Sequence, residues 1–394
     1  MSKLEELIQQ YCPDGVEYVK LGDIEGQGYI KLGRGNVISK QDMKDCPGDF
    51  PVYSSSSVGD GEIGRYGKYM FDDERISWSI DGGGKFFYRN NLRYSITNVS
   101  GWLKVLAPKV VSTKYLYYTL MNEWVKKVYD YTHKAHPSVI REEYIIPIPP
   151  LPVQEEIVRI LDAFAELQAE LQAELQKRLQ QYNYYRDNLL SFEGRTDVEW
   201  VTIEQLFHRK NGYTPSKANP DFWTNGTIPW FRMEDIRENG RILTNSIQKV
   251  HPSAVKKNSL VRAGSIILAT SATIGEHALV NVDCLTNQRF TCLTVKEDYS
   301  HKVDIKFIFY YMFKVDEWCR THTVQGNFPG VDMSLFPNVS IPLPTLDEQK
   351  RIASILDRFD ALTTDLTAGL PAEIEKRRQQ YEFYRDKLLT FKRK

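Results

Sequence analysis

Four short segments imitate motifs of enzymes that bind cofactors or cleave nucleic acid. GDGEIG at 59–64 has the glycine spacing of a dinucleotide-binding loop, but the β-like RYGKYMF follows it, so no helix N-terminus faces a phosphate and we predict a turn. NPDF at 219–222 differs at its third position from the Asp/Asn-Pro-Pro-aromatic motif of amino-methyltransferases, and GGGK at 82–85 lacks the spacing and the Ser/Thr of a P-loop. EQK at 348–350 imitates the end of a nuclease motif without its partner aspartate, so we interpret it as surface charge. These departures argue against catalysis by the chain itself.

The remaining residues suited to chemistry are hydrogen-bonding, basic and aromatic side chains in two loop-rich regions, about 25–147 and 207–338. Such side chains read base edges and hold phosphates in DNA-binding proteins, although each of them could equally be a solvated loop residue. The candidate DNA-contacting residues of the first region are Ser54, Ser55, Ser56, Ser57, Lys85, Tyr88, Arg89, Asn98, His133, Lys134 and His136. Those of the second are Lys210, Thr214, Ser216, Lys217, Arg232, Ser271, Thr273, Gln288, Arg289, Gln325 and Asn327.

Two of these candidates, His133 and His136, lie in a polar loop with no third ligand at metal spacing. We therefore predict no metal site and interpret both as loop or DNA-contacting residues. Their loop, THKAHPSV at 132–139, has a counterpart in THTVQGNFPGV at 321–331. The two loops occupy equivalent places in the two halves of the chain, which supports the loops more strongly than any single residue.

Composition indicates a folded chain of two or three domains. The 394 residues exceed one ordinary core, and 42% of them are hydrophobic. Lys plus Arg equals Asp plus Glu at 51 each, so DNA binding requires clustered cations or a partner with a positive surface. The five cysteines form no CxxC pair, and neither a signal peptide nor a long apolar run is evident, so we expect free thiols in the cytoplasm and no membrane insertion.

The chain repeats two segments at long range. LPVQEEIVRILDAF at 151–164 matches LPTLDEQKRIASILDRF at 343–359, with Gln, Ile, Leu and Asp in register. QQYNYYRDNLLSF at 180–192 matches QQYEFYRDKLLTF at 379–391, but the separation of the copies has grown by four residues. The second copy is therefore four residues longer between its two matching segments.

The N-terminus continues this repeat. GVEYVKLGDI at 15–24 is similar to DVEWVTIEQL at 197–206, and LEELI at 4–8 aligns with RDNLL at 186–190. The repeat is therefore circular: one copy begins near the C-terminus and continues at the N-terminus. We predict that residues 1–12 pack beside the C-terminal end of the second helical segment, because their amphipathic pattern needs an apolar partner.

The repeated segments predict long helices. Apolar residues recur at steps of three and four over 153–192 without Gly or Pro, which corresponds to a helix of about 60 Å. In the second copy, Gly369 and Pro371 predict a break. The regions between combine short β-like runs with aromatic helical segments at 114–131 and 305–322, as in mixed α+β domains.

The central helix contains AELQ three times in succession, from Ala165 to Gln176. Four residues turn a helix through about 400°, so one unit more or less leaves Leu167, Leu171 and Leu175 nearly in line while the length changes by about 6 Å. We therefore predict that this repeat is a segment of adjustable length that sets a spacing. The alternative is a stable, solvent-exposed helix with no such role.

The pattern as a whole resembles the DNA-specificity subunit of type I restriction–modification systems. The resemblance covers essentially the whole chain and depends on the Pro-Leu-Pro entries, the Q-x-x-I-x-x-I-L-D runs and the Y-R-D-x-L-L-x-F ends. NGYTPSK at 211–217 with IPW at 228–230 is similar to the start of many recognition domains in that family, and some members carry tetrapeptide repeats in the central helix.

This resemblance implies an α+β fold with two inverted target-recognition domains separated by two long antiparallel coiled-coil helices, in a pseudo-two-fold, circular repeat. It further implies a non-catalytic chain that reads a bipartite double-stranded DNA site with a non-specific spacer. Two methyltransferase subunits would dock on it, and restriction subunits would join through the complex. S-adenosylmethionine, ATP and Mg are then expected on those partner subunits, with no cofactor on this chain.

The expected boundaries are recognition domain 1 at 1–147 with a helical stub at 1–12, helical spacer 1 at 148–192, recognition domain 2 at 193–340 and helical spacer 2 at 341–394. Two alternatives stay open at this point. The chain could be a coiled-coil scaffold that binds only protein, or a restriction or methylation enzyme in its own right. The DNA sequence itself does not follow from these side chains.

Overall fold

The computed structural model describes the chain except for residues 1, 56–58, 131, 326–328 and 365–367. The chain divides into two compact units. The first consists of Met1–Glu170 together with Lys376–Lys394, and the second of Leu171–Glu375. The first unit therefore contains segments from both ends of the sequence, as the circular repeat predicts.

The first unit is an α+β structure. Its strands are β1 (Tyr18–Lys20), β2 (Ile30–Arg34), β3 (Phe50–Tyr53), β4 (Glu62–Tyr66), β5 (Arg75–Ser79), β6 (Phe86–Arg89), β7 (Ser95–Ile96), β8 (Ser100–Val105) and β9 (Ile145–Pro147). They form an antiparallel sheet β2-β8-β5-β6, a sheet β4-β3-β7 and the pair β1-β9. Its helices are α1 (Lys3–Tyr11), α2 (Leu21–Gly26), α3 (Lys40–Asp45), α4 (Thr113–Trp124), α5 (Pro137–Glu143), the start of α6 (Leu151–Leu189) and most of α11 (Leu370–Leu388).

The second unit repeats this plan. Its strands are β10 (Glu199–Thr202), β11 (Phe207–Asn211), β12 (Ile228–Phe231), β13 (Ile242–Leu243), β14 (Lys249–Val250), β15 (Ser265–Ala269), β16 (His277–Val280), β17 (Leu285–Thr286), β18 (Phe290–Val295), β19 (Thr323–Val324), β20 (Gly330–Val331) and β21 (Ser340–Leu343). The sheet β11-β18-β15-β16-β13 corresponds to β2-β8-β5-β6, and β14-β12-β17 corresponds to β4-β3-β7. Its main helices are α7 (Ile203–Leu206), α8 (Met233–Asn239), α9 (Ile305–Thr321), α10 (Leu346–Thr363) and the end of α6.

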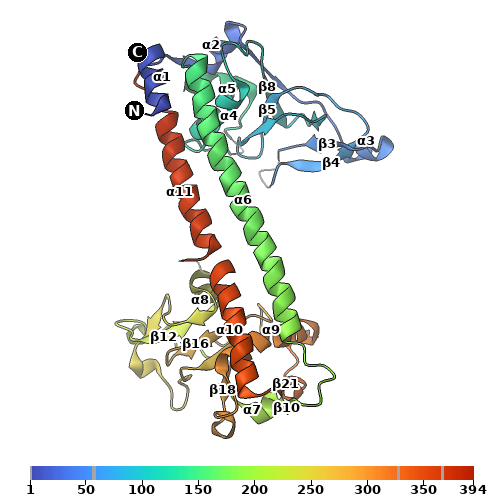
Figure 1. The fold of residues 1–394 in the computed structure, drawn as a ribbon, viewed down its shortest axis with the longest axis vertical. Coiled ribbons are helices and arrows are strands. Elements are labelled where there is room, and N and C mark those ends of the chain that lie inside the picture. The colour runs from blue at the N-terminus through green and yellow to red at the C-terminus, as the bar shows by residue number, and fades with distance from the viewer. Residues whose placement is uncertain (1, 56–58, 131, 326–328, 365–367) are drawn as a thin grey trace. The chain divides into compact units, whose positions relative to one another are not determined.

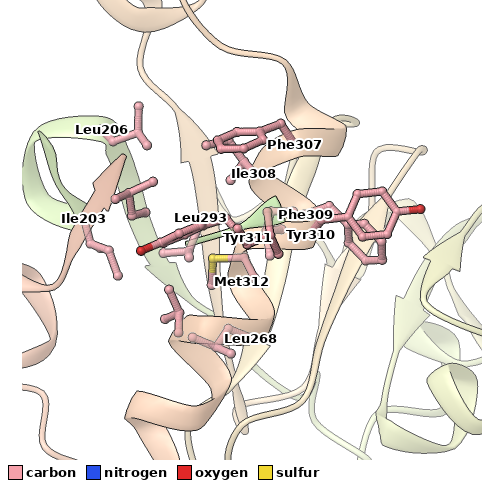
Figure 2. Close-up of a cluster of buried hydrophobic side chains, with 14 of the residues drawn as sticks. Ile203, Leu206, Leu268, Leu293, Phe307, Ile308, Phe309, Tyr310, Tyr311 and Met312 are labelled. Carbon is pink, nitrogen blue, oxygen red and sulfur yellow. The ribbon is translucent and has the colours of Figure 1, made fainter. Parts of the chain in front are cut away.

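The core of the second unit forms where α9 packs on the larger sheet. Asp304 caps α9 by accepting from the N–H groups of Lys306 and Phe307, and the apolar run that follows is buried. Leu268 of β15 and Leu293 of β18 meet this helix in the cluster of Figure 2. Each large side chain buried in this way contributes about 1.5–3 kcal/mol, so α9 is a main source of stability for the sheet.

Each long helix is joined to the α+β domain of its own unit by a buried glutamine. Gln154 on α6 accepts from Ser112 N–H at 2.9 Å and donates to Val110 O at 2.8 Å and Pro149 O at 2.7 Å. Its counterpart is Gln349 on α10, whose partners are Asp304 N–H, Lys302 O and Pro344 O. We call these two side chains the glutamine anchors. They explain the Gln of the repeated motif, because both are fully buried and each satisfies three backbone groups.

The Asp of the same motif makes a second connection. In the first unit, Asp162 accepts from Tyr118 Oη at 2.6 Å and Lys114 Nζ at 2.7 Å. In the second unit, Asp357 accepts from Tyr310 Oη at 2.8 Å and Lys306 Nζ at 2.5 Å. These repeated contacts bind α4 to α6 and α9 to α10.

Aromatic rings pair the helices within each unit. In the first, the ring of Phe164 on α6 stacks on Tyr384 of α11 with centroids 5.5 Å apart. In the second, the ring of Phe359 on α10 stacks on Tyr185 of α6, again at 5.5 Å. In each unit, the first matching segment of one copy therefore packs on the second matching segment of the other copy.

The N-terminal segment packs where the circular repeat predicts. Leu4, Leu7 and Ile8 of α1 share an apolar cluster with Leu388 and Leu389, at the end of α11 (Figure 1). The following residues pair with the C-terminus as well, since Val16 N–H donates to Lys392 O at 2.8 Å and Lys394 N–H donates to Val16 O at 3.2 Å. The prediction for this segment is therefore confirmed for the described residues 2–12.

The helix predictions hold with one correction. The continuous helix α6 and the break in the second copy are both confirmed, because α10 ends at Thr363 and α11 begins at Leu370. The helix expected over 114–131 ends instead at Trp124, whose indole N–H donates to Gly83 O at 2.7 Å. Beyond the helix, the Tyr129 ring lies against Gly84, where a Cβ would be 2.5 Å from the ring.

Candidate nucleic-acid interface

A hollow of about 300 Å³ in the second unit brings candidate residues together from three parts of the chain. Its lining residues are Thr214, Lys217, Trp230, Arg232, Glu234, Asn287, Gln288 and Arg289. Five of these are DNA-contacting candidates from the sequence. With three cationic side chains and one carboxylate among these lining residues, this hollow, which we call the basic hollow, clusters positive charge in a chain whose net charge is zero.

Strand pairing positions the basic hollow. The strands β12 and β17 run parallel, with Phe231 opposite Thr286, so the residues that follow them emerge at the same edge. Asn287 N–H donates to Phe231 O at 3.0 Å and continues this pairing by one bond. Arg232 and Gln288 are therefore neighbours in space although 56 positions separate them in the sequence.

Arg232 is held in place by an aromatic platform. Its guanidinium carbon lies 5.4 Å from the ring centroid of Trp230, at cation–π distance. Trp230 is only 4% exposed, and its indole N–H donates to Tyr213 O at 3.2 Å. The Nε of Arg232 is buried without a hydrogen-bond partner in the described structure, and its nearest carboxylate, Glu234, is 4.0 Å away. Arg232 therefore lines the basic hollow with one buried donor that the described structure does not satisfy.

Two amide side chains in the basic hollow are oriented by bonds to their oxygen atoms. Thr214 Oγ1 donates to Gln288 Oε1 at 2.6 Å, and Arg289 N–H donates to Asn287 Oδ1 at 3.1 Å. Because both oxygens accept from the protein, the amide groups keep their N–H donors for another molecule. The side chains of Arg289 and Lys217 are exposed and add further donors.

The first unit has the same backbone frame at the equivalent place. Three backbone hydrogen bonds of the first unit have counterparts in the second. Thr97 N–H donates to Tyr53 O as Asn287 N–H donates to Phe231 O, and Gly35 N–H donates to Ser100 O as Gly212 N–H donates to Phe290 O. In the same way, Asn36 N–H donates to Ile96 O and Tyr213 N–H donates to Thr286 O. This frame places Ser54, Thr97, Asn98 and Val99 at the positions of Arg232, Asn287, Gln288 and Arg289. The candidates Ser54 and Asn98 are therefore the counterparts of Arg232 and Gln288.

At this place in the first unit, the hydroxyls of Ser54 and Thr97 and the backbone carbonyl oxygens of Asn98 and Ser55 are bonded internally. The hydroxyls of Ser54 and Thr97 are bonded to each other at 2.8 Å, and Asn98 O accepts from the Arg34 guanidinium at 2.7 Å. Ser55 O accepts from the Ser79 hydroxyl. Ser56 and Ser57 lie outside the described residues.

Tyr88 and Arg89 on β6 are tied into the first unit. Arg89 is 5% exposed, with its guanidinium 3.5 Å from the Tyr53 ring centroid and its Nε donating to Ser77 Oγ. Tyr88 donates its hydroxyl to Glu74, and burial together with that carboxylate raises its pKa. The polar groups of both residues are therefore engaged by other residues of the first unit. Lys85, in contrast, is half-buried with its Nζ 5.3 Å from the Phe87 ring.

The two loops singled out in the sequence are attached at equivalent positions. Ala135 N–H donates to Ile80 O directly after β5, and Val331 N–H donates to Thr270 O directly after β15, which confirms the equivalence. In the first loop, His133 Nε2 lies 2.8 Å from a carboxylate oxygen of Glu143. The other two candidates of this loop are Lys134, paired with Asp81 at 3.0 Å, and His136, the residue before α5.

Five described candidates of the second unit do not line the basic hollow. Lys210 Nζ donates to Leu260 O, and Ser216 O accepts from the Trp223 indole. Ser271 forms an isolated β-bridge with Gly330, and the Thr273 hydroxyl is buried without a partner among the described residues. Gln325 is exposed, and the further candidate Asn327 lies outside the described residues. The structure thus does not bring the five described candidates into one site.

Sequence reasoning missed three residues of the basic hollow. Asn287 lies beside the candidates Gln288 and Arg289, and Glu234 lies two positions after Arg232, so each was within reach of the same argument. Trp230 belongs to the quoted IPW segment, but its role as a platform depends on the position of Arg232. The pairing of β12 with β17 is the information that would have identified them.

Three of the segments that imitate enzyme motifs have structural explanations. In EQK, Gln349 is fully buried as a glutamine anchor, so the interpretation of this segment as surface charge is wrong for that residue. A turn at Gly59–Gly61 leads into strand β4, as predicted. In GGGK, a Cβ on Gly82 would lie 1.7 Å from Ser55 O, so the glycine permits a close approach of two chain segments.

Among the described residues, no three His, Cys, Asp or Glu side chains are grouped to hold a metal ion. All five cysteines are free thiols, and within the described chain every helix is too short or too polar to cross a bilayer.

Aromatic side chains are also exposed on the long helices, at one place in each unit. Tyr184 and Tyr185 of α6 are 66% and 46% exposed, and Phe383 and Tyr384 of α11 are 64% and 37% exposed. Within each pair the rings are in edge contact, with centroids 5.5 and 5.4 Å apart. We call these the exposed aromatic pairs; large exposed aromatic groups are typical of protein interaction surfaces.

Comparison with known proteins identifies the two repeats. Residues 13–181 and 195–376 each match the family model described as the type I restriction modification DNA specificity domain. The chain is 53% identical over 203 residues to the type I restriction enzyme EcoprrI specificity subunit of Escherichia coli, covering 50% of this chain and 51% of that relative. It is 38% identical over 295 residues to the EcoR124I/EcoR124II specificity subunit of Escherichia coli, covering 71% of this chain and 70% of that relative.

Solved structures show the same fold. The type I restriction–modification S subunit of M. genitalium aligns with a TM-score of 0.56 at 14% identity, over 95% of this chain and 96% of that one. A chain of another solved type I restriction–modification system aligns with a TM-score of 0.57 at 16% identity, over 96% and 98%. At these identities the likeness concerns the fold alone.

Proposed function

Since the chain belongs to the family of type I restriction–modification DNA-specificity proteins, we propose that it is the non-catalytic DNA-recognition subunit of such a complex. Each unit reads one half of a bipartite double-stranded site, and the bases between the halves are not read. The proposed domain boundaries follow the sequence repeat, with recognition regions 1–147 and 193–340 and helical regions 148–192 and 341–394.

The basic hollow is the observation that carries this proposal. It gathers hydrogen-bond donors and three cations at one edge of a sheet, in a chain whose net charge is zero. Donors at fixed positions suit base edges, and the cations suit phosphates. The first unit has the same backbone frame with different side chains, as expected if two half-sites of different sequence are read.

We further propose that the exposed aromatic pairs bind two methyltransferase subunits, one for each repeat. The pairs occur at matching positions of the two repeats, so two copies of one partner could bind in the same way. Restriction subunits join through that complex. S-adenosylmethionine, ATP and Mg are bound by the partner subunits, and this chain supplies sequence recognition only.

The test is methylome sequencing of cells that carry this chain with its methyltransferase partner, compared with cells in which only this chain is exchanged for a relative. A changed bipartite methylation motif is expected. An unchanged motif would disprove the proposal. In addition, a gel shift of the purified complex on random-sequence duplexes separates DNA recognition from the scaffold alternative, which predicts no binding.

A further inference from the structure

We propose that Arg232 and Arg289 are specificity-determining residues that read guanine in the half-site of the second unit. This inference rests on the proposed function and adds the chemistry of one half-site to it. The two residues are brought together in the basic hollow by the parallel pairing of β12 and β17. Their types and surroundings decide which base they fit.

The polar groups left free in the basic hollow are mainly donors. Arg232 and Arg289 carry only donors. Among the described residues, neither makes an ion pair closer than the 4.0 Å between Arg232 Nε and the Glu234 carboxylate. The amide oxygens of Asn287 and Gln288 already accept from the protein, so their free groups are N–H donors as well. A molecule that binds in the basic hollow must therefore present hydrogen-bond acceptors.

Among the bases, guanine fits this requirement best. In the major groove guanine presents two acceptors, O6 and N7, whereas cytosine presents a donor, adenine one acceptor with one donor, and thymine a single acceptor beside a methyl group. Arginine binds the two guanine acceptors with two parallel N–H groups. The Trp230 platform restricts Arg232 before binding, which lowers the entropy lost when it contacts a base.

The first unit indicates that these are positions of readout and not of folding. At the places of Arg232 and Arg289 it has Ser54 and Val99, and the backbone bonds around them are nevertheless the same. Neither arginine is thus needed to form the frame. The first unit, by the same argument, does not read guanine from these two positions.

The experiment measures methylation of a DNA library with a randomised second half-site by the assembled complex, with Arg289→Lys and Arg232→Lys variants. Lysine keeps the charge and loses the paired donors. We expect each variant to lower the preference for guanine at one position of the second half-site by roughly tenfold to a hundredfold, and to leave the first half-site unchanged. Arg262→Lys is the matched control, because Arg262 is 73% exposed, pairs with Asp283 and does not line the basic hollow.

Two results would overturn the inference while leaving the proposed function intact. One is a wild-type motif without guanine in the second half-site. The other is an unchanged motif in both lysine variants, with Arg289→Gln weakening binding equally on all sequences, which is the behaviour of a phosphate contact. The proposed function fails separately, if the wild-type complex methylates no motif that depends on this chain.

Discussion

Replacing Gln154 with Glu should loosen the attachment of α6 to its own α+β domain. Gln154 is fully buried and makes three hydrogen bonds, two of them as a donor to Val110 O and Pro149 O. Glutamate keeps the shape of the side chain and its acceptor for Ser112 N–H. Glutamate also places a carboxylate oxygen against the two carbonyl oxygens. Its carboxyl group must then either remain charged in this buried site or bind a proton. Both outcomes are unfavourable.

The expected magnitude follows from the hydrogen bonds that are lost. One or two buried carbonyl oxygens lose their donor, at about 1–3 kcal/mol each, which gives a local loss of about 3 kcal/mol. Opening of this region should then become about a hundredfold more frequent. Ser112 caps α4, so the amide groups of Tyr115 and Leu116 at its start should lose the most protection.

Hydrogen–deuterium exchange of the full chain with its partner measures this loss peptide by peptide. Glu155→Gln is the matched control, because it makes the opposite change at the adjacent, exposed position. Gln349→Glu should move the effect to the start of α9 and leave α4 unchanged. Equal protection of α4 in Gln154→Glu and Glu155→Gln would refute the role of the glutamine anchors.

Three further predictions concern the helices. Deletion of residues 169–172, one AELQ unit, should shorten the non-specific spacer of the methylated site by one or two base pairs. About 6 Å of helix corresponds to about two base-pair steps of 3.4 Å along the DNA. A folded, assembled variant that still prefers the original spacing would contradict this prediction. Changing both residues of either exposed aromatic pair to serine should reduce the methyltransferase subunits retained per chain in size-exclusion chromatography; undiminished retention would exclude these pairs as docking sites. Arg159 and Lys3 lower the pKa of Glu156 from near 4.5 to about 2, so its carboxylate stabilises the fold above about pH 4.5 and loses this effect as the pH falls toward 2. Glu156→Gln should therefore flatten the fall of the urea midpoint in that range, and parallel curves for both proteins would rule this out.

The sequence predicted the elements whose pattern is local. The apolar period of α6 and the Gly-Pro pair before α11 both lie within a few residues of what they determine. The packing of α1 on the end of α11 was also predictable, although it is distant in sequence, because the repeat relates it to a junction inside the chain. In contrast, the sequence did not explain the glutamine anchors, since Val110 and Ser112 lie 44 and 42 positions before Gln154.

The DNA-contacting candidates divide by the same reasoning. Arg89 was chosen for its charge, but it lies on the inner side of β6 and stacks on Tyr53, and only the register of the strand decides that. Thr214, Arg232 and Gln288 are candidates by residue type alone. The pairing of β12 with β17 brings Arg232 and Gln288 into one hollow, where Thr214 Oγ1 donates to Gln288. Residue type therefore indicates side chains suited to DNA binding, whereas strand register decides which of them lie together in one hollow. The same register, repeated in the first unit with neutral side chains at the matching places, makes the two surfaces comparable position by position, which is why exchanging one side chain should change one base of one half-site.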